Sequence, residues 1–136
     1  MTFEESVEWL YATQKFGIKL GLENTRRLLS ALGDPQTGLR VIHVAGTNGK
    51  GSVCAMAESI LRHAEYRTGL FTSPHLVDFC ERIRVGGVNV PTDFVARELT
   101  RIREISATWE HCPTFLKLSL PSRSCFFPGK NVMSLF

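Results

Sequence analysis

The stretch Val41-Ile42-His43-Val44-Ala45-Gly46-Thr47-Asn48-Gly49-Lys50-Gly51-Ser52 joins the pattern of a buried strand to a glycine-rich loop. Its first four residues are mostly apolar or β-branched, and a helix-forming segment follows the loop at once. A strand, a glycine-rich loop and a helix in this order direct backbone N–H groups and the positive end of a helix dipole at an anion. The stretch therefore predicts an α/β fold with a phosphate-binding loop.

The residue types of this loop suit the phosphates of a nucleotide. Glycine carries no Cβ, so the backbone can approach phosphate oxygens closely. Lys50 is predicted to reach the terminal phosphates as a point charge, and the Ser52 hydroxyl to ligate the accompanying Mg²⁺. The candidate nucleotide-binding residues are Gly46, Thr47, Asn48, Gly49, Lys50, Gly51 and Ser52.

The spacing of the loop is a variant of the usual phosphate-loop pattern. Ala45 stands where that pattern has glycine, and Gly51 separates Lys50 from Ser52. The structural alternative is an ordinary glycine-containing turn after a strand. The strand, lysine, hydroxyl and helix all fall in the expected order, which favours phosphate binding over the turn.

Length and composition bound the class of protein. The 136 residues suit one domain, and 43% hydrophobic with 21% charged residues is ordinary for a globular protein. The net charge of +3 is too small to indicate a nucleic-acid surface, and no stretch concentrates Lys and Arg. We therefore expect small-molecule ligands and no nucleic-acid partner.

Four cysteines, at positions 54, 80, 112 and 125, show neither a CxxC pair nor the spacing of metal ligands. Reduced thiols are expected, with Cys54 and Cys80 as small core residues rather than nucleophiles. No charged leader precedes an apolar core, and no apolar run approaches the roughly eighteen residues of a membrane span. These features predict a cytoplasmic protein without a membrane partner.

Apolar periodicity outside the loop predicts four helices. They begin near residues 2, 23, 51 and 92, and the last three end near 32, 63 and 110. Thr2 and Glu5 have capping-box spacing at the first start. The third helix is predicted to face a core with Val53, Met56, Ile60 and Leu61. The fourth is predicted to do so with Val95, Leu99, Ile102, Ile105 and Trp109.

Arg67-Thr68-Gly69-Leu70-Phe71 is predicted as the strand that follows the third helix. A strand, a helix and a parallel strand then form a βαβ unit. Ligands bind at the carboxyl ends of the strands in such sheets. Thr72 and Ser73 are therefore expected beside the phosphate loop.

Two further segments have both a functional and a structural interpretation. Residues 81–85 and 88–90 alternate around a Gly-Gly turn and predict a hairpin, with Arg82 and Arg84 on one face. That face is solvated by default, and anion binding by one arginine is the alternative. Residues 15–21 are predicted as a loop that either lines a ligand site or simply connects two helices.

The segments His43 to Ser52, Thr72 to Leu76 and Glu81 to Ile83 together resemble folylpolyglutamate synthase/dihydrofolate synthase, of the Mur ligase superfamily. The upstream segments Lys19 to Glu23 and Leu32 to Gln36 also resemble this family. The resemblance covers about residues 1–115, which implies the N-terminal part of an ATP-binding ligase domain. The implied fold is α/β, an incomplete P-loop Mur-ligase-type central ATPase domain with a parallel βαβ core and a β-hairpin.

The resemblance implies an ATP-dependent carboxylate–amine ligase. Such enzymes use MgATP to phosphorylate a carboxylate of folate or dihydropteroate, and the amine of glutamate then attacks the acyl phosphate. Carried over by motif, Thr47 to Ser52 would bind the phosphates, with Lys50 as the catalytic residue. Ser52 and Ser73 would hold Mg²⁺, and Arg82 is a weaker candidate for the substrate side.

Glu65 is a small departure from the family, which usually has glycine at this position after the third helix. Placing a non-glycine residue in a left-handed conformation there costs roughly 1 kcal/mol. A carboxylate at the negative end of a helix dipole adds a little more. We expect this residue to weaken the fold rather than to abolish binding.

The tail departs from the family more seriously. After Phe115 the family continues with an aromatic residue and a metal-binding glutamate, whereas this chain has Leu116 and Lys117. A lysine would repel Mg²⁺ where a carboxylate should bind it. We therefore expect residues 116–136 to be an aberrant tail, and our hypothesis for its origin is one lost base near the codon for Leu116.

The shortened chain and altered tail leave a second interpretation open. In it the chain is a truncated, non-catalytic remnant that binds nucleotide weakly at most. A third interpretation, another Mur ligase that acts on a cell-wall precursor, is less favoured by the residues of the two loops.

Overall fold

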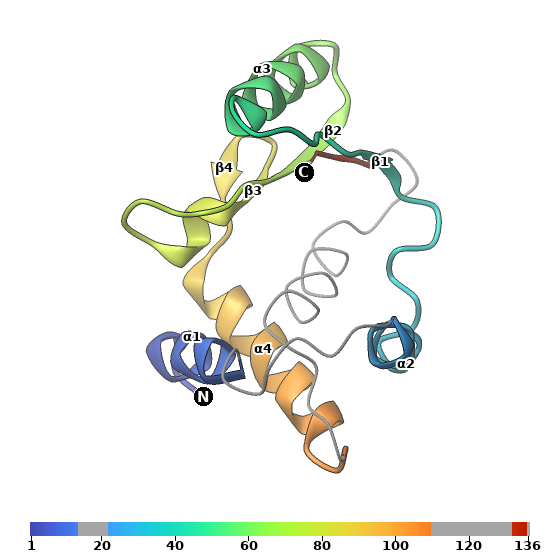
Figure 1. Ribbon diagram of the computed structural model, residues 1–136, viewed down its shortest axis with the longest axis vertical. Coiled ribbons are helices and arrows are strands. Elements are labelled where there is room, and N and C mark those ends of the chain that lie inside the picture. Colours follow the sequence, from blue (N-terminus) through green and yellow to red (C-terminus); the bar gives the residue numbers. More distant parts are fainter. Residues whose placement is uncertain (14–21, 110–131, 136) are drawn as a thin grey trace. The chain divides into compact units, whose positions relative to one another are not determined.

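The computed structural model describes residues 1–13, 22–109 and 132–135 (Figure 1). The chain divides into two compact units. The helical unit contains the described residues of 1–37 and 92–125, and the sheet unit contains those of 38–91 and 126–136.

The helical unit consists of α1 (Phe3–Ala12), α2 (Glu23–Ala31) and α4 (Thr92–Ser106). The predicted capping box of α1 is confirmed, because the Thr2 hydroxyl accepts from the Glu5 N–H while the Glu5 carboxylate accepts from the Thr2 N–H. The buried apolar residues of the unit are Leu10, Leu28, Leu32, Val95, Ala96, Leu99 and Ile102. These side chains form the core of the helical unit.

The predicted apolar face of α4 is largely confirmed. Val95, Leu99 and Ile102 are buried, whereas Ile105 and Trp109 are half-buried. The helix ends at Ser106, before the predicted end near residue 110. The Arg27 guanidinium of α2 lies 4.3 Å from the centroid of the Trp109 ring, so a cation–π contact links α2 to the residues that follow α4.

The sheet unit contains five strands, one α-helix and one short 3₁₀ helix. In chain order these are β1 (Arg40–Ile42), α3 (Lys50–His63), β2 (Arg67–Phe71), η2 (Phe79–Arg82), β3 (Ile83–Val85), β4 (Val88–Asn89) and β5 (Val132–Leu135). The strand order is β1-β5-β2-β3-β4.

The parallel and antiparallel pairings agree with the predicted architecture. β1 and β2 each pair in parallel with β5, so they run in the same direction, as a βαβ unit requires. They are not neighbours, because β5 lies between them; the sequence analysis predicts no strand at 132–135. β3 and β4 form the predicted antiparallel hairpin, with Val85 opposite Val88.

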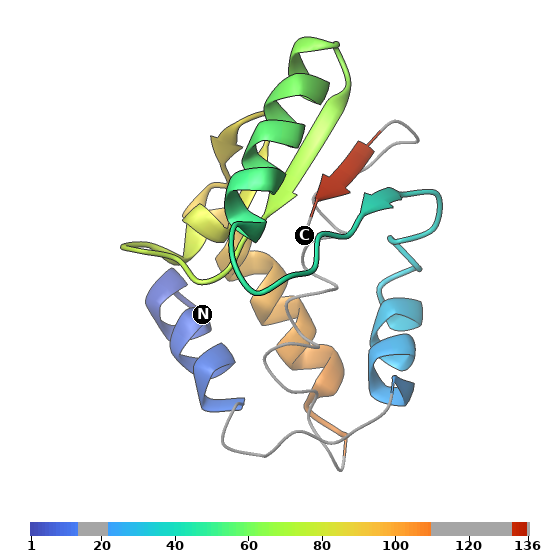
Figure 2. The same ribbon diagram turned by 45° about the horizontal axis from the view of Figure 1, so that its top comes forward.

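The buried face of α3 differs from the predicted one. Val53, Met56 and Ile60 are 47%, 59% and 70% exposed. The helix instead lies along β2 (Figure 2) and packs Cys54 against Leu70, with Ala57 and Leu61 beside them. Both faces of the helix carry apolar residues, so periodicity alone does not distinguish them. Of the four residues predicted to face the core, Leu61 does so, and Val53, Met56 and Ile60 do not.

The first strand is also more exposed than its sequence predicts. Val41 and Ile42 are 52% and 39% exposed, and only Val44, just after β1, packs against the cluster under α3. The prediction of a buried strand here is therefore wrong for this structure. The reason is that α3 packs on β2 rather than across β1.

Several predictions concern residues outside the described ones. The loop at 15–21 and the tail at 116–131 belong to this group, so the boundary near residue 115 stays a prediction. Among the described residues, no helix combines the length and apolar character needed to cross a membrane.

Candidate phosphate-binding site

The candidate site begins where the chain leaves β1 and enters α3. Gly49 is the N-cap of α3 and has φ +75° and ψ 0°. This left-handed conformation is open to glycine without strain and costs other residues about 1–2 kcal/mol. A Cβ at Gly49 would meet no atom within 4 Å, so the backbone conformation, and not crowding, is what requires glycine.

The N-terminus of α3 presents backbone donors to the loop. The Val53 N–H is hydrogen-bonded to the Gly49 carbonyl oxygen at 3.0 Å, and no side chain caps this end of the helix. The N–H groups of residues 50–52 precede this first intrahelical bond. Together with the positive end of the helix dipole, they form a site suited to an anion.

Lys50 adds a positive charge to the same loop. Its Nζ donates to the carbonyl oxygen of Gly46 at 2.5 Å, and it lies 3.4 Å from the carbonyl oxygen of Thr47. The ammonium group is therefore held at the loop that the helix N-terminus faces. Residues 45–52 are all exposed, so a ligand can reach them.

The second candidate segment follows β2. β1 and β2 are both parallel to β5, so they end at the same edge of the sheet. With one strand between them, the two strands lie roughly 10 Å apart. The phosphate loop and the Thr72–Ser73 segment therefore rise from one edge, as predicted, and both carry an exposed hydroxyl, at Ser52 and Ser73.

Arg82 is not in the predicted position. It lies in η2 rather than on a strand face shared with Arg84, and it is only 9% exposed. Its Nε donates to Nδ1 of His75 at 2.7 Å, and its guanidinium lies 5.6 Å from the centroid of the Phe79 ring. Arg84 is exposed and donates from Nε to Oδ1 of Asn89 at 3.0 Å. The predicted common face of the two arginines is thus wrong.

A local sequence signal for η2 lies at residues 78–81. Asp78 and Glu81 have capping-box spacing, and each side chain accepts a backbone N–H near the other residue. This box starts a helical turn, so Glu81 and Arg82 leave the strand pattern. Sequence analysis also gave no role to His75, because its contact with Arg82 depends on the folded loop.

The two cysteines of the sheet unit are buried and free. Burial raises the pKa of the Cys54 thiol. Burial raises the pKa of the Cys80 thiol most, and Asp78 raises it further through a hydrogen bond and through its negative charge. Together they bring this pKa from 9.0 to about 12. Both thiols are therefore neutral core groups, as expected, and unsuited to nucleophilic chemistry.

The donor set at the sheet edge suits a nucleotide better than a metal alone. No group of three or more His, Cys, Asp or Glu side chains within the described residues could hold a metal ion. Hydroxyls such as those of Ser52 and Ser73 are hard oxygen ligands, and Mg²⁺ is usually held by few protein ligands together with phosphate oxygens. The position where the family has a metal-binding glutamate, Lys117, lies outside the described residues.

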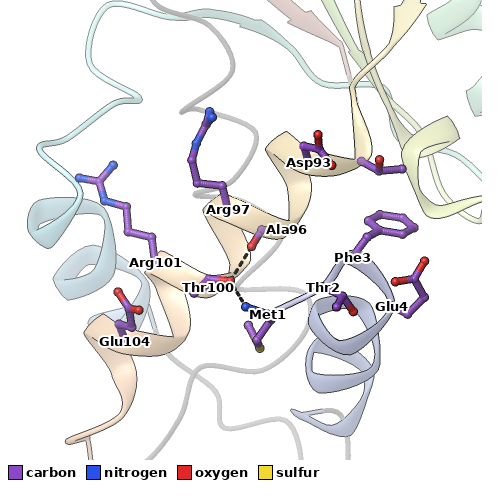
Figure 3. Close-up of a pocket in the computed structure, with 11 residues that line it drawn as sticks. Met1, Thr2, Phe3, Glu4, Asp93, Ala96, Arg97, Thr100, Arg101 and Glu104 are labelled. Carbon is purple, nitrogen blue, oxygen red and sulfur yellow. Dashed lines mark hydrogen bonds between the residues drawn. The ribbon is translucent and has the colours of Figure 1, made fainter.

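A separate cavity of about 730 Å³ belongs to the helical unit (Figure 3). It lies between the start of α1 and one face of α4, where the Thr100 hydroxyl donates to the Ala96 carbonyl oxygen at 2.7 Å. Its charged side chains are of both signs: Arg97, Arg101, Glu4, Asp93 and Glu104. This lining does not select an anion, and no residue of the phosphate loop contributes to it.

Comparison with known proteins gives a consistent result. No family model matches the chain. It is 46% identical over 91 residues to the "Probable bifunctional folylpolyglutamate synthase/dihydropteroate synthase" of Haloferax volcanii. The aligned residues make up 67% of this chain and 11% of the relative. It is 43% identical over 88 residues to the dihydrofolate synthase/folylpolyglutamate synthase of Bacillus subtilis, covering 65% of this chain and 20% of the relative.

Solved structures agree with these relatives. The folylpolyglutamate synthase of Thermotoga maritima superimposes with a TM-score of 0.83 and 32% identity, over 98% of this chain and 32% of that chain. These matches identify the chain with the folylpolyglutamate/dihydrofolate synthase family. The fold is accordingly the Mur-ligase-like α/β fold that the sequence predicts.

Two further structures of the family contain ligands. FolC of Escherichia coli, solved in complex with ADP, matches with a TM-score of 0.78 and 33% identity over 98% of this chain and 32% of that chain. A bifunctional folylpolyglutamate synthase/dihydrofolate synthase with Mn, AMPPNP and L-glutamate bound matches with a TM-score of 0.77 and 29% identity over 96% of this chain and 32% of that chain. The chain thus spans about a third of these structures and a fifth or less of the two curated relatives.

Proposed function

We propose that this chain carries the nucleotide-binding segment of an ATP-dependent carboxylate–amine ligase of folate metabolism. The observation that carries the proposal is the phosphate loop: a left-handed Gly49 opens an uncapped α3, and Lys50 Nζ lies over the loop. The ADP and AMPPNP bound by solved relatives support a nucleotide as its ligand.

The proposed reaction forms an amide in two transfers. A carboxylate oxygen of folate or dihydropteroate attacks the γ-phosphorus of ATP, and ADP leaves. The amine of glutamate then attacks the carbonyl carbon of this acyl phosphate, and inorganic phosphate leaves with that oxygen. The L-glutamate bound by one relative supports it as the amine substrate.

The residues of the loop would act on the transferred phosphoryl group. Charge that develops on its oxygens is stabilised by fixed donors, here the N–H groups of residues 47–52 and the ammonium group of Lys50. Mg²⁺ would supply further charge neutralisation, and the Ser52 and Ser73 hydroxyls are its proposed protein ligands. Direct contact of Arg82 with the substrate stays the weaker proposal, because its side chain is buried against His75.

A second candidate function is nucleotide binding without catalysis. The observation in its favour is Lys117, which stands where the family has a metal-binding glutamate. A cation at this position would oppose Mg²⁺ while leaving the phosphate loop intact. We also infer a cytoplasmic location, which the free thiols of Cys54 and Cys80 support.

One assay separates the two candidates. ADP release would be measured with ATP and Mg²⁺ present, with and without both dihydropteroate or a reduced folate and glutamate. Release that needs both substrates and is lost in Lys50→Ala supports the ligase. Nucleotide binding by the wild type without such release supports the non-catalytic function, and the absence of both contradicts the two proposals together.

A further inference from the structure

Arg82 holds both ends of the turn that contains Ser73. Its carbonyl oxygen accepts the Thr72 N–H at 3.0 Å, and its Nε donates to Nδ1 of His75 at 2.7 Å. The first bond fixes the residue before Ser73, and the second fixes the residue after Pro74. Ser73-Pro74 is therefore the short stretch between two contacts of a single residue.

The Arg82 side chain, which makes the contact to His75, is itself fixed by packing, whereas the contact to Thr72 is made by the Arg82 backbone. Arg82 is 9% exposed and Phe79 is 6% exposed. The guanidinium lies 5.6 Å from the Phe79 ring centroid, and the His75 ring meets the Phe79 ring edge-on, with centroids 6.2 Å apart at an interplanar angle of 66°. The side chains of Arg82, His75 and Phe79 thus pack together, so the Arg82 guanidinium cannot move away without losing its contacts to His75 and Phe79.

The Glu81 carboxylate accepts hydrogen bonds from the backbone of the next part of the loop. Its Oε2 accepts the Leu76 N–H at 2.9 Å, and its Oε1 accepts the Asp78 N–H at 3.2 Å. The Val77 N–H lies 3.5 Å from Oε2. These backbone bonds, led by that of Leu76, lower the pKa of Glu81, which keeps it the charged acceptor. Glu81 and Arg82 together hold the loop from Thr72 to Asp78.

We propose that Arg82 is a positioning residue, which fixes the Ser73 hydroxyl at the carboxyl edge of the sheet for metal binding. This inference rests on the proposed function, because that function makes Ser73 a metal ligand. It replaces direct substrate binding by Arg82 with an indirect role. Mutation of a residue that orients a metal ligand without touching the metal typically lowers the affinity for the metal about 10- to 100-fold.

The test measures Mn²⁺ binding to the full chain saturated with AMPPNP, by electron paramagnetic resonance of the free ion. In Arg82→Lys the positive charge is kept but the planar Nε donor and the ring contact are lost. We expect Mn²⁺ to bind about tenfold more weakly, while AMPPNP binding without metal changes less than about twofold. Arg84→Lys is the matched control, because Arg84 makes a similar Nε bond on the exposed side of β3, and it should leave Mn²⁺ binding unchanged.

A second variant tests the same proposal if Arg82→Lys does not fold. His75→Ala removes the acceptor while Arg82 remains, and it should weaken Mn²⁺ binding to a similar extent. Unchanged Mn²⁺ affinity in the folded variant overturns the positioning role alone. Equal losses of Mn²⁺ and metal-free AMPPNP binding also overturn it, since they indicate a general structural effect. A wild type that binds AMPPNP but no Mn²⁺ contradicts the proposed metal site itself, and with it this role.

Discussion

The Thr68 hydroxyl on β2 donates to Oε1 of Glu58 on α3 at 2.6 Å, and both residues are buried. The same oxygen lies 3.3 Å from Nε of Arg62, one turn farther along the helix. This pair of contacts lets a carboxylate face the sheet, because a buried charge is tolerated when it is hydrogen-bonded and paired.

Replacing Thr68 by valine should destabilise the sheet unit. The shape of the side chain is kept, but Glu58 loses its buried donor, at an expected cost of about 1–3 kcal/mol. Urea denaturation measures the effect. Thr68→Ser is the control, since it keeps the hydroxyl and loses only a methyl group. If the valine variant proves as stable as the serine variant, the bond does not have the proposed importance.

This contact also explains why the orientation of α3 could not be predicted. Periodicity favoured Val53, Met56, Ile60 and Leu61 for the core, and of these Leu61 packs against it. The helix otherwise packs through Cys54 and Glu58. A buried glutamate depends on partners ten positions away on β2 and four positions away on α3, and only the folded arrangement brings all of them together.

Replacing Glu65 by glycine should stabilise the chain. Glu65 has φ +63°, and it ends α3 in a Schellman motif: its N–H bonds to the Arg62 carbonyl oxygen and the Tyr66 N–H to that of Leu61. Glycine removes the strain of a left-handed Cβ, which is worth about 1 kcal/mol. Thermal unfolding of Glu65→Gly beside Glu65→Ala checks this, because alanine removes the carboxylate and keeps the Cβ. Equal stability of the two variants would argue against backbone strain.

Features set by residues close together in the sequence, such as the end of α3, could be predicted, whereas those set by residues far apart in the sequence could not. The Thr2 capping box and the β2 strand each follow from neighbouring residues, and the left-handed conformation of Glu65 is what the resemblance to the family implies. The insertion of β5 between β1 and β2 depends on pairing across more than sixty positions. The Gly46–Ser52 loop was predictable because its glycine, lysine and hydroxyl spacing is local.

Gly49 and Gly51 should respond oppositely to alanine. Gly49→Ala places a Cβ at φ +75° and is expected to cost about 1–2 kcal/mol of unfolding free energy. Gly51 lies in the first turn of α3 with no atom within 4 Å of an added Cβ, so Gly51→Ala should be neutral or stabilise by up to about 1 kcal/mol. Denaturant melts of the two variants compare these effects. A destabilising Gly51→Ala paired with a neutral Gly49→Ala would be inconsistent with this loop conformation.

The thiol of Cys80 should be unreactive in the native state. Its pKa of about 12 lies above the ordinary value of 9.0, so little thiolate exists at pH 8. Alkylation by iodoacetamide, followed at this site by mass spectrometry, should be about 100-fold slower or more than in urea. The stabilising effect of the neutral thiol is complete below pH 9.0 and is lost as the pH rises toward about 12. Rapid native alkylation at pH 8 would show that the thiol is not buried.

The most direct test of the central claim is calorimetric titration of the chain with ADP and Mg²⁺. The wild type should bind, and Lys50→Ala should lose affinity by about 2 kcal/mol or more, because a charge-assisted contact to phosphate is removed. Arg67→Ala is the control: it removes an exposed cation at the start of β2, away from the carboxyl edge, and should bind as the wild type does. Equal ADP affinity in the wild type and Lys50→Ala would contradict the phosphate-binding role of the Gly46–Ser52 loop.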